Sequence, residues 1–268
     1  MSTFSLPDGG HLAYDDLGEG VPVVLLHDGV LHRRAWDQQL PALTDYRVLN
    51  LDLRGHGESG DPRSAYLRAD DVIALLDHAQ VPEAFLVGIG LGATTSMDAV
   101  LDYPDRVSGV LASGGGASEQ YWNDPFVVDI RKRQYEVAVQ GDKESYVELF
   151  LNMWVDGPYR EPHEVPAAVR ERCRDMAMHT VTEHAREEPF LPGRTKRTWE
   201  RLPEITTKIL FVHGELNNGD AREMTERTVS AVPDAKLIRF EGAGHMVNME
   251  QPERFNAVMR EFLDWGTA

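Results

Sequence analysis

The stretch Ala84–Gly92, AFLVGIGLG, decides the fold of this chain. Its first six residues are apolar or small and are typical of a buried strand, and a helical pattern, Leu91–Tyr103, follows directly. Gly88, Gly90 and Gly92 crowd the junction, where glycine lets the backbone turn sharply without clashes. We therefore expect a strand, a tight turn centred on Gly90 and a helix, in that order.

Five further apolar runs are predicted to be strands: Val21–His27, Arg47–Leu53, Val107–Ser113, Lys208–His213 and Lys236–Phe240. Helical patterns alternate with them, at Ala65–Ala79, Ala221–Val232 and Glu253–Trp265. Strands that alternate with helices indicate an α/β fold, in which a mostly parallel sheet is covered by helices on both faces.

The alternation stops between residues 117 and 201, a polar stretch that is mainly helical by pattern and too long for a plain loop. We expect a helical cap here, laid over the carboxyl ends of the strands, where an open α/β sheet binds its ligands. The predicted division is an α/β core at 1–116 and 202–268, with the cap at 117–201.

Four segments, in this order and spacing, resemble motifs of the α/β-hydrolase fold superfamily: Leu25–Gly29 with Trp36, Asp52–Ser59 (DLRGHGES), Gly88–Gly92 and Gly242–His245 (GAGH). Another match, His213–Asn217 (HGELN), stands at the loop that supplies the acid of that family's catalytic triad. The resemblance spans nearly the whole chain. It implies an α/β-hydrolase fold with a mostly parallel eight-stranded sheet, helices on both faces and an inserted helical cap.

The resemblance also implies a triad of serine, histidine and acid, and two of these positions are changed. Gly90 stands at the position of the nucleophile, so that no side-chain atom can attack a carbonyl there. Asn217 stands at the position of the acid, and an amide cannot carry the charge that stabilises an imidazolium. Asp220 or Glu215 could replace that acid, although Asp220 is more typical of a helix N-cap.

Asp28 is a third departure, because the family usually has glycine after the histidine of this segment. The resemblance places N–H donors for an oxyanion beside it, including that of Leu91, and a carboxylate there would repel the oxyanion. Asp28 either faces the pocket, to pair with His245 or accept a substrate proton, or faces solvent and bonds its own loop. His245 is retained, either as a general acid or base or as inherited packing. His245 and Asp28 are our catalytic candidates.

The candidate substrate-binding residues are Gly90, Leu91, Gly29, His32, Trp122 and Trp154. The missing side chain of Gly90 is expected to enlarge the pocket floor. The two cap tryptophans are expected either to line the pocket or to pack within the cap. His27 and His56 are expected to be structural.

Other side chains offer no convincing substitute chemistry. Thr94, Thr95, Ser96 and Cys173 are better explained by packing than as replacement nucleophiles, and Thr94 is expected to face away from the pocket mouth. The histidines show no spacing of metal ligands. We expect neither a metal nor a cofactor.

Composition limits the classes of function that fit this chain. It has 268 residues, 42% of them hydrophobic, and a formal net charge of −17, which disfavours nucleic acid and anionic membrane surfaces as partners. No run of about 18 apolar residues is present, we expect no secretion signal, and a single cysteine excludes an internal disulfide. We expect a cytoplasmic protein whose partner is a small molecule, and leave a homodimer open.

These observations favour a non-hydrolytic enzyme that uses acid–base catalysis on a small, largely apolar metabolite, as a lyase, dehydratase, isomerase or cyclase does. An inactive protein that binds a ligand or a partner is the first alternative. A hydrolase in which His245 activates water is the second. Convergence of Asp28 and His245 over Gly90 would favour the enzyme over the inactive protein.

Overall fold

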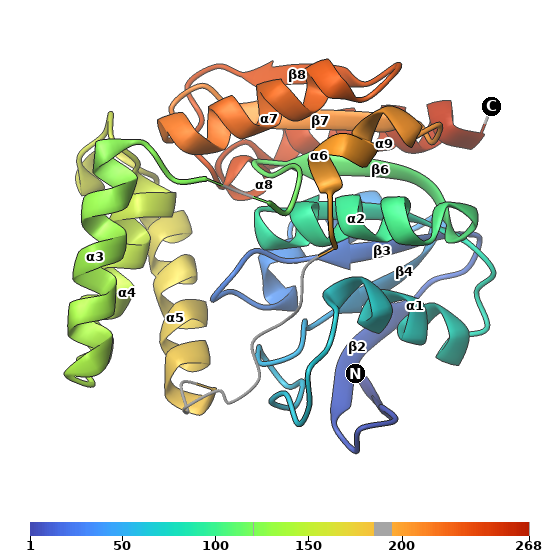
Figure 1. The fold of residues 1–268 in the computed structure, drawn as a ribbon, viewed down its shortest axis with the longest axis horizontal. Helices are drawn as coiled ribbons and strands as arrows, with labels where there is room; N and C mark the ends of the chain where they lie inside the picture. The colour runs from blue at the N-terminus through green and yellow to red at the C-terminus, as the bar shows by residue number, and fades with distance from the viewer. Residues whose placement is uncertain (120, 185–194, 268) are drawn as a thin grey trace.

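The computed structural model describes residues 1–119, 121–184 and 195–267. Its centre is one eight-stranded sheet in the order β1-β2-β4-β3-β5-β6-β7-β8, as Figure 1 shows in part. From β4 to β8 all neighbours are parallel, whereas β1 and β2 are antiparallel to their neighbours. The strands are β1 (Ser2–Ser5), β2 (His11–Leu17), β3 (Val21–Leu26), β4 (Tyr46–Leu51), β5 (Ala84–Ile89), β6 (Val107–Ser113), β7 (Ile209–Gly214) and β8 (Lys236–Phe240). This is the predicted α/β-hydrolase fold.

The six strands predicted from apolar runs are all present, and β5, β6 and β8 have the predicted bounds. Every residue of β5 is buried, because the strand lies inside the sheet between β3 and β6 with helices on both faces. The pattern did not reveal β1 and β2. In β2, the consecutive buried residues Leu12, Ala13 and Tyr14 replace the alternation that identifies an exposed antiparallel strand.

Helices cover both faces of the sheet. The helices α1 (Arg68–His78), α2 (Leu91–Asp102) and α7 (Gly219–Ala231) contribute to the core on one face, and α9 (Pro252–Thr267) packs on the other. Two short helices, α6 (Thr198–Arg201) and α8 (Val247–Glu250), complete this part. Within the described ranges, no helix is long and apolar enough to cross a membrane.

Among the described residues between β6 and β7, three helices of 8 to 17 residues lie in the range predicted for the cap and stand together beside the end of the sheet in Figure 1. They are α3 (Pro125–Val139), α4 (Lys143–Phe150), which continues into a π-helical turn at Leu151–Asp156, and α5 (Ala167–Glu183). Val127, Ile130, Leu149 and Met153 form a small core within them. The apolar face of α5 joins the main core of the α/β unit, so the cap helices are packed onto the sheet layer.

The loops after β3 and β4 are held together by the buried imidazole of His27. Its Nδ1–H donates to the carbonyl of Asp28 at 2.7 Å, and its Nε2 accepts the N–H of Leu53 at 2.9 Å. Burial lowers the pKa of His27 to about 4 and that of His56 to about 3, so both rings are neutral near pH 7. His27 therefore has the predicted structural role, and it fixes the backbone that carries Asp28.

The loop after β4 is fixed by a buried arginine. Arg54 donates to both carboxylate oxygens of Asp71 and to Asp8, and its guanidinium lies 4.4 Å from the ring centroid of Tyr66. Asp71 is 4% exposed, so removal of the arginine would leave a buried carboxylate without its cation.

We expect Arg54→Ala to lower the free energy of unfolding by about 3–5 kcal/mol, because it leaves this carboxylate uncompensated. The matched control is Arg47→Ala, which removes a bidentate pair with Asp16 in which both side chains are 30% exposed. That loss should be at most about 1 kcal/mol. Urea unfolding measures both, and equal losses would contradict a structural role specific to Arg54.

Candidate functional site

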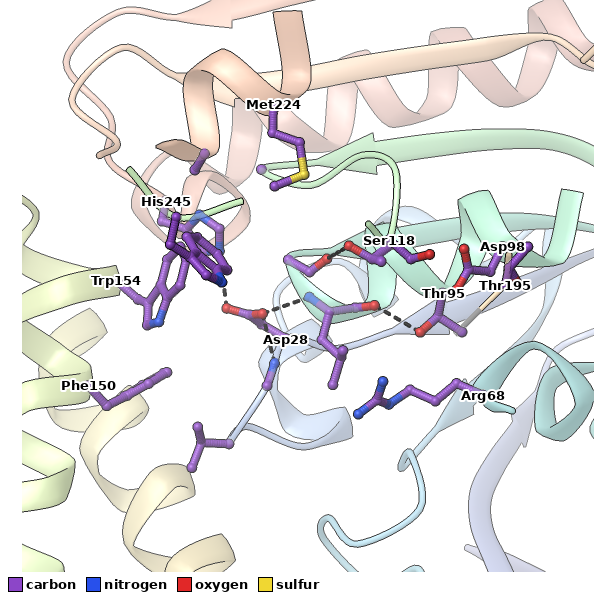
Figure 2. Close-up of a pocket in the computed structure, with 18 of the residues that line it drawn as sticks. Asp28, Arg68, Thr95, Asp98, Ser118, Phe150, Trp154, Thr195, Met224 and His245 are labelled. Atoms are coloured by element: carbon purple, nitrogen blue, oxygen red, sulfur yellow. Dashed lines mark hydrogen bonds and ion pairs between the residues drawn. The ribbon is translucent and has the colours of Figure 1, made fainter. Parts of the chain in front are cut away.

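The carboxylate of Asp28 lies at the turn between β5 and α2. Its Oδ1 accepts the N–H of Leu91 at 2.8 Å and the N–H of Gly29 at 2.7 Å (Figure 2). These are the backbone donors of the position that the resemblance identified as an oxyanion hole. A single carboxylate oxygen of the protein itself therefore fills that position.

The same oxygen occupies the space that Gly90 leaves free. A Cβ atom built on Gly90 would lie 1.8 Å from Oδ1 of Asp28, so no side chain fits while the carboxylate is there. Gly90 has φ +51°, a left-handed conformation that glycine adopts without strain. The expectation that Gly90 enlarges the pocket floor was wrong, because Asp28 folds back into the vacant space.

His245 faces the second oxygen of this carboxylate. Its Nε2 lies 3.1 Å from Oδ2 of Asp28, and both side chains are more than nine-tenths buried. On the other side of the ring, Nδ2 of Asn217 lies 2.9 Å from Nδ1 of His245. Asp28 and His245 therefore converge over Gly90, and Asn217 completes a chain of three hydrogen-bonded side chains.

The orientation of the Asn217 amide determines where the proton of His245 resides. Oδ1 of Asn217 accepts the backbone N–H of Asn218 at 2.9 Å, so its Nδ2 must face the histidine and donate to Nδ1. Nδ1 is then unprotonated, and the neutral ring carries its proton on Nε2, which donates to Asp28. In a serine hydrolase the polarity is the reverse, because there Nδ1 donates to the acid and Nε2 accepts from the serine.

The carboxylate of Asp28 is held in its ionised form. Burial acts to raise its pKa, but the electrostatic attraction and the hydrogen bond of His245, together with the N–H groups of Leu91 and Gly29, outweigh burial and hold the pKa below the usual value of 3.8. Asp28 is therefore negatively charged across the neutral range.

The loop that carries His245 is braced by the cap. Glu250 accepts the N–H of Gly244 and pairs with Arg160, whose guanidinium also donates to the carbonyl of Val155 at 2.7 Å. Trp154, in the π-helical turn, places its ring centroid 4.7 Å from that of His245. Arg160 and Glu250 were not predicted from the sequence, because they are 90 residues apart and belong to no recognised motif.

A cavity of about 560 Å³ opens above Asp28 and His245. Its walls combine apolar side chains of the core and the cap with a few polar groups. The residues that line it include Asp28, Gly29, Leu67, Arg68, Gly90, Leu91, Thr94, Thr95, Asp98, Ser118, Trp122, Arg131, Phe150, Trp154, Thr195, Met224 and His245. Its volume suits a small molecule.

Several predicted binding residues meet in this cavity, since Gly29, Gly90, Leu91, Trp122 and Trp154 all line it. His32 does not. Its ring is buried in a separate hollow against His179, with 5.5 Å between the ring centroids, because the residue stands at the start of the 3₁₀ turn Arg33–Trp36, whose first N–H group is bound by Asp52. The assignment of His32 to the substrate site was wrong.

Neither suggested replacement for the triad acid reaches His245. Asp220 accepts the backbone N–H groups of Asn123 and Asp124 and so fixes the start of α3, while Asn218 is the N-cap of α7. Glu215 is exposed at the surface. The position of the acid is thus held by Asn217 alone.

The other side chains considered as nucleophiles are occupied or unsuitable. The hydroxyls of Thr94, Thr95 and Ser96 donate to the carbonyls one turn earlier in α2. Thr94 and Thr95 do line the cavity, so Thr94 does not face away from it as expected. Burial raises the pKa of the Cys173 thiol, which disfavours the reactive thiolate. Among the described residues, no group of histidine, cysteine and carboxylate side chains is placed to hold a metal ion.

Fold and site together define an α/β-hydrolase core whose nucleophile position is occupied by a carboxylate from a neighbouring loop. A model of the Alpha/beta hydrolase family matches residues 23–258, and the chain belongs to that family.

Individual relatives cover nearly the whole chain. A 3-oxoadipate enol-lactonase 2 of Acinetobacter baylyi is 28% identical over 243 residues, which cover 85% of this chain and 84% of the relative. A Bacillus subtilis protein provisionally named a 2-succinyl-6-hydroxy-2,4-cyclohexadiene-1-carboxylate synthase is 23% identical and covers 97% of both chains. A solved hydrolase structure from Pseudomonas aeruginosa gives a TM-score of 0.78 at 27% identity, covering 98% of this chain and 97% of that one.

The overlap between Asp28 and a side chain at position 90 predicts strong coupling. Gly90→Ser alone should lower the free energy of unfolding by about 1–3 kcal/mol, because the new side chain overlaps the carboxylate. In the Asp28→Gly background the same change should cost markedly less. Thermal unfolding of the two single variants and the double variant measures the coupling, and additive losses would show that Asp28 does not occupy this space.

A catalytic version of this comparison uses p-nitrophenyl acetate. The triple variant Asp28→Gly, Gly90→Ser, Asn217→Asp should hydrolyse this ester, because it has a nucleophile, an open oxyanion hole and a triad acid. The matched control, Gly90→Ser, Asn217→Asp with Asp28 retained, should stay near the background rate. Equal rates of hydrolysis in the triple and the double variant would contradict the conclusion that Asp28 blocks the oxyanion hole.

The reversed polarity of His245 can be read directly by ¹⁵N NMR of its ring. The protein should show a proton on Nε2 and none on Nδ1 when the ring is neutral. In Asn217→Asp, a carboxylate replaces the donor at Nδ1, so the ring lies between two carboxylates and should be doubly protonated at pH 7. A proton on Nδ1 in the unaltered protein would refute the assignment.

Proposed function

We propose that this chain is a non-hydrolytic enzyme, in which Asp28 and His245 move a proton on a small, largely apolar molecule without a serine-type covalent intermediate. The observation that carries the proposal is the placement of Asp28, with Oδ1 in the oxyanion hole and Oδ2 on His245. The reaction class is that of a lyase, dehydratase, isomerase or cyclase.

The occupied hole argues against acyl transfer. Hydrolysis of an ester or lactone needs free N–H groups to stabilise the oxyanion, and loss of one such donor costs about 10²–10³ in rate. Here the N–H groups of Leu91 and Gly29 are both engaged by a permanent negative charge. That charge would also repel a second anion at the same point.

Asp28 is the proton acceptor that this arrangement favours. A carboxylate offers about four lone-pair sites. Oδ1 uses its share on two N–H donors, while Oδ2 has one bond, to His245, and keeps a site for a substrate proton. His245 holds the carboxylate in place through the hydrogen bond that its Nε2–H group donates to Oδ2.

The low pKa of Asp28 narrows the choice of substrate. A weakly basic carboxylate removes a proton efficiently only when that proton is already acidic, as on a carbon next to a carbonyl and an aromatic ring or on an enol. The apolar walls around Phe150 and Met224 suit the rest of such a molecule. We therefore propose a small, carbonyl-bearing ring compound as the type of substrate.

Hydrolysis by water activated at His245 is a weaker alternative. Its support comes from relatives such as the enol-lactonase, whose names denote hydrolases. A histidine that activates water needs an unprotonated nitrogen facing the cavity, but here Nε2 donates to Asp28 and the unprotonated Nδ1 faces Asn217. The synthase among the relatives carries a name that does not denote a hydrolase.

An inactive ligand-binding protein is the other alternative. Such a protein has no requirement for an ionised carboxylate and a histidine within hydrogen-bonding distance at the cavity floor. Their convergence, 3.1 Å between Nε2 and Oδ2, supports the enzyme.

The test follows deuterium uptake at C1 of 2-tetralone in D₂O, a ring ketone whose C1–H lies between an aromatic ring and a carbonyl. Binding is first verified by quenching of tryptophan fluorescence, since Trp122 and Trp154 line the cavity. The protein should accelerate the exchange, and Asp28→Asn should reduce the acceleration by about 10²-fold or more. His245→Ala should also reduce it, because the carboxylate loses its partner.

Two outcomes would overturn the proposal. A ketone that binds but exchanges no faster than in buffer would indicate a binding protein. Rapid hydrolysis of p-nitrophenyl acetate that is lost in His245→Ala would indicate a hydrolase.

The pH profile identifies the base. Because the pKa of Asp28 lies below its usual value, the carboxylate remains ionised throughout the range above that value, and it loses its charge only as the pH falls through the lowered pKa. The exchange rate at saturating ketone should therefore stay level between about pH 5 and pH 8. A histidine base would instead lose activity as the pH falls through about 6.5. A decline in that range would assign the base role to His245.

A further inference from the structure

A second polar group lies at the end of the cavity opposite His245. Figure 2 shows Asp98, Ser118, Thr95 and Thr195 together at this end, while His245, Trp154 and Phe150 lie at the other. The catalytic proposal uses none of the first four.

Two atoms of this group are buried without a hydrogen bond of ordinary geometry in the described part of the chain, although their side chains lie close enough for the hydroxyl of one to lower the pKa of the other. They are Oδ1 of Asp98, on α2, and Oγ of Ser118, which follows β6. Ser118 is 7% exposed. Unpartnered polar atoms are costly in a protein interior, and two of them on side chains that line one cavity indicate that a ligand supplies their partner.

Asp98 is poised to be neutral in this environment. Burial raises its pKa to about 7, assisted by the charge of Asp102 on the same helix and opposed by the Ser118 hydroxyl, by Arg68 on α1 and by the backbone at Thr195. A neutral carboxyl group can donate one hydrogen bond and accept others, as a serine hydroxyl can.

We infer that Asp98 and Ser118 bind an uncharged oxygen function of the ligand, a carbonyl or a hydroxyl, at the end of the molecule remote from Asp28. Ligand cations are disfavoured at this end of the cavity below about pH 7, because a neutral Asp98 offers no charge to pair with them and the charge of Arg68 acts on the same carboxyl group. The inference deepens the proposed function, on which it rests, by adding a polar end to its ring substrate. It concerns binding and is tested as binding.

The test compares four ligands that share the tetralin skeleton and differ only at C6, at one end of the ring system: a ketone (6-acetyltetralin), an alcohol (6-(hydroxymethyl)tetralin), an amine (6-(aminomethyl)tetralin) and tetralin itself. Their affinities are measured by calorimetry or by tryptophan quenching. At pH 6.5 the ketone and the alcohol should bind more tightly than tetralin by about threefold to tenfold, as expected for one neutral hydrogen bond, and more tightly than the amine.

Variants of Asp98 distinguish a neutral contact from a charged one. Asp98→Asn keeps a donor and an acceptor and should preserve the ketone's affinity, whereas Asp98→Ala should reduce it to that of tetralin. Ser118→Ala should lower the affinity for the ketone and for the alcohol and leave the affinity for tetralin unchanged. The control is Asp105→Asn, at an exposed residue beyond the same helix, which should change nothing.

The pH dependence supplies a second readout. The ketone only accepts hydrogen bonds, so its affinity for the unaltered protein should fall as the pH rises through about 7 and Asp98 ionises. The alcohol can donate a hydrogen bond to the ionised carboxylate, so its affinity should fall less over the same range. In Asp98→Asn the affinity for the ketone should not change with pH.

Three results would overturn the inference: an Asp98→Asn variant as weak as Asp98→Ala, tighter binding of the amine than of the ketone, or equal affinity of all four ligands. These results are distinct from failure of the catalytic proposal. Binding of the 6-acetyl ketone that depends on Asp98, together with bound 2-tetralone that exchanges no deuterium, would support the inference and contradict the proposed catalysis.

Discussion

One oxygen of the Asp28 carboxylate fills the position in which an α/β-hydrolase enzyme binds the oxyanion of its substrate, and the other oxygen pairs with His245. This placement determines the rest of the site. Residue 90 must be glycine, since a Cβ there would overlap the carboxylate. His245 must donate from Nε2, and Asn217 rather than an acid then satisfies its Nδ1. The three departures from a serine triad are therefore one linked change.

Much of this fold could be predicted from the sequence, because its central strands are continuous apolar runs separated by amphipathic helices. The prediction was weakest at β1 and β2, where Leu12, Ala13 and Tyr14 are buried in succession and no alternation is visible. The departures at Gly90, Asn217 and Asp28 were also identifiable, because the flanking motifs fix their positions. Whether Asp28 faced the pocket or solvent depended on one side-chain rotation, which no sequence pattern encodes.

The rest of the site depends on contacts between distant segments. Arg160 and Glu250 meet between the cap and the histidine loop, and Asp98 and Ser118 meet at the far end of the cavity, and neither pair lies in a recognisable motif. The available signal for Asp98 was that it is the one charged residue between Leu91 and Leu101 in the helix after β5. His32 was misassigned because proximity to Asp28 in sequence was taken for proximity in space, although the intervening turn directs it into another hollow.

The overlap at residue 90 also limits the order in which such a site can evolve from one that contains serine. With a side chain at position 90, a carboxylate at position 28 has no room to turn inward, so an aspartate gained first would not reach the backbone N–H groups or His245 and would offer no new chemistry. The serine must be lost before or together with that gain. Once the carboxylate is seated, a return to serine alone destabilises the protein and leaves the oxyanion hole filled, so a serine would become useful only after the aspartate is lost.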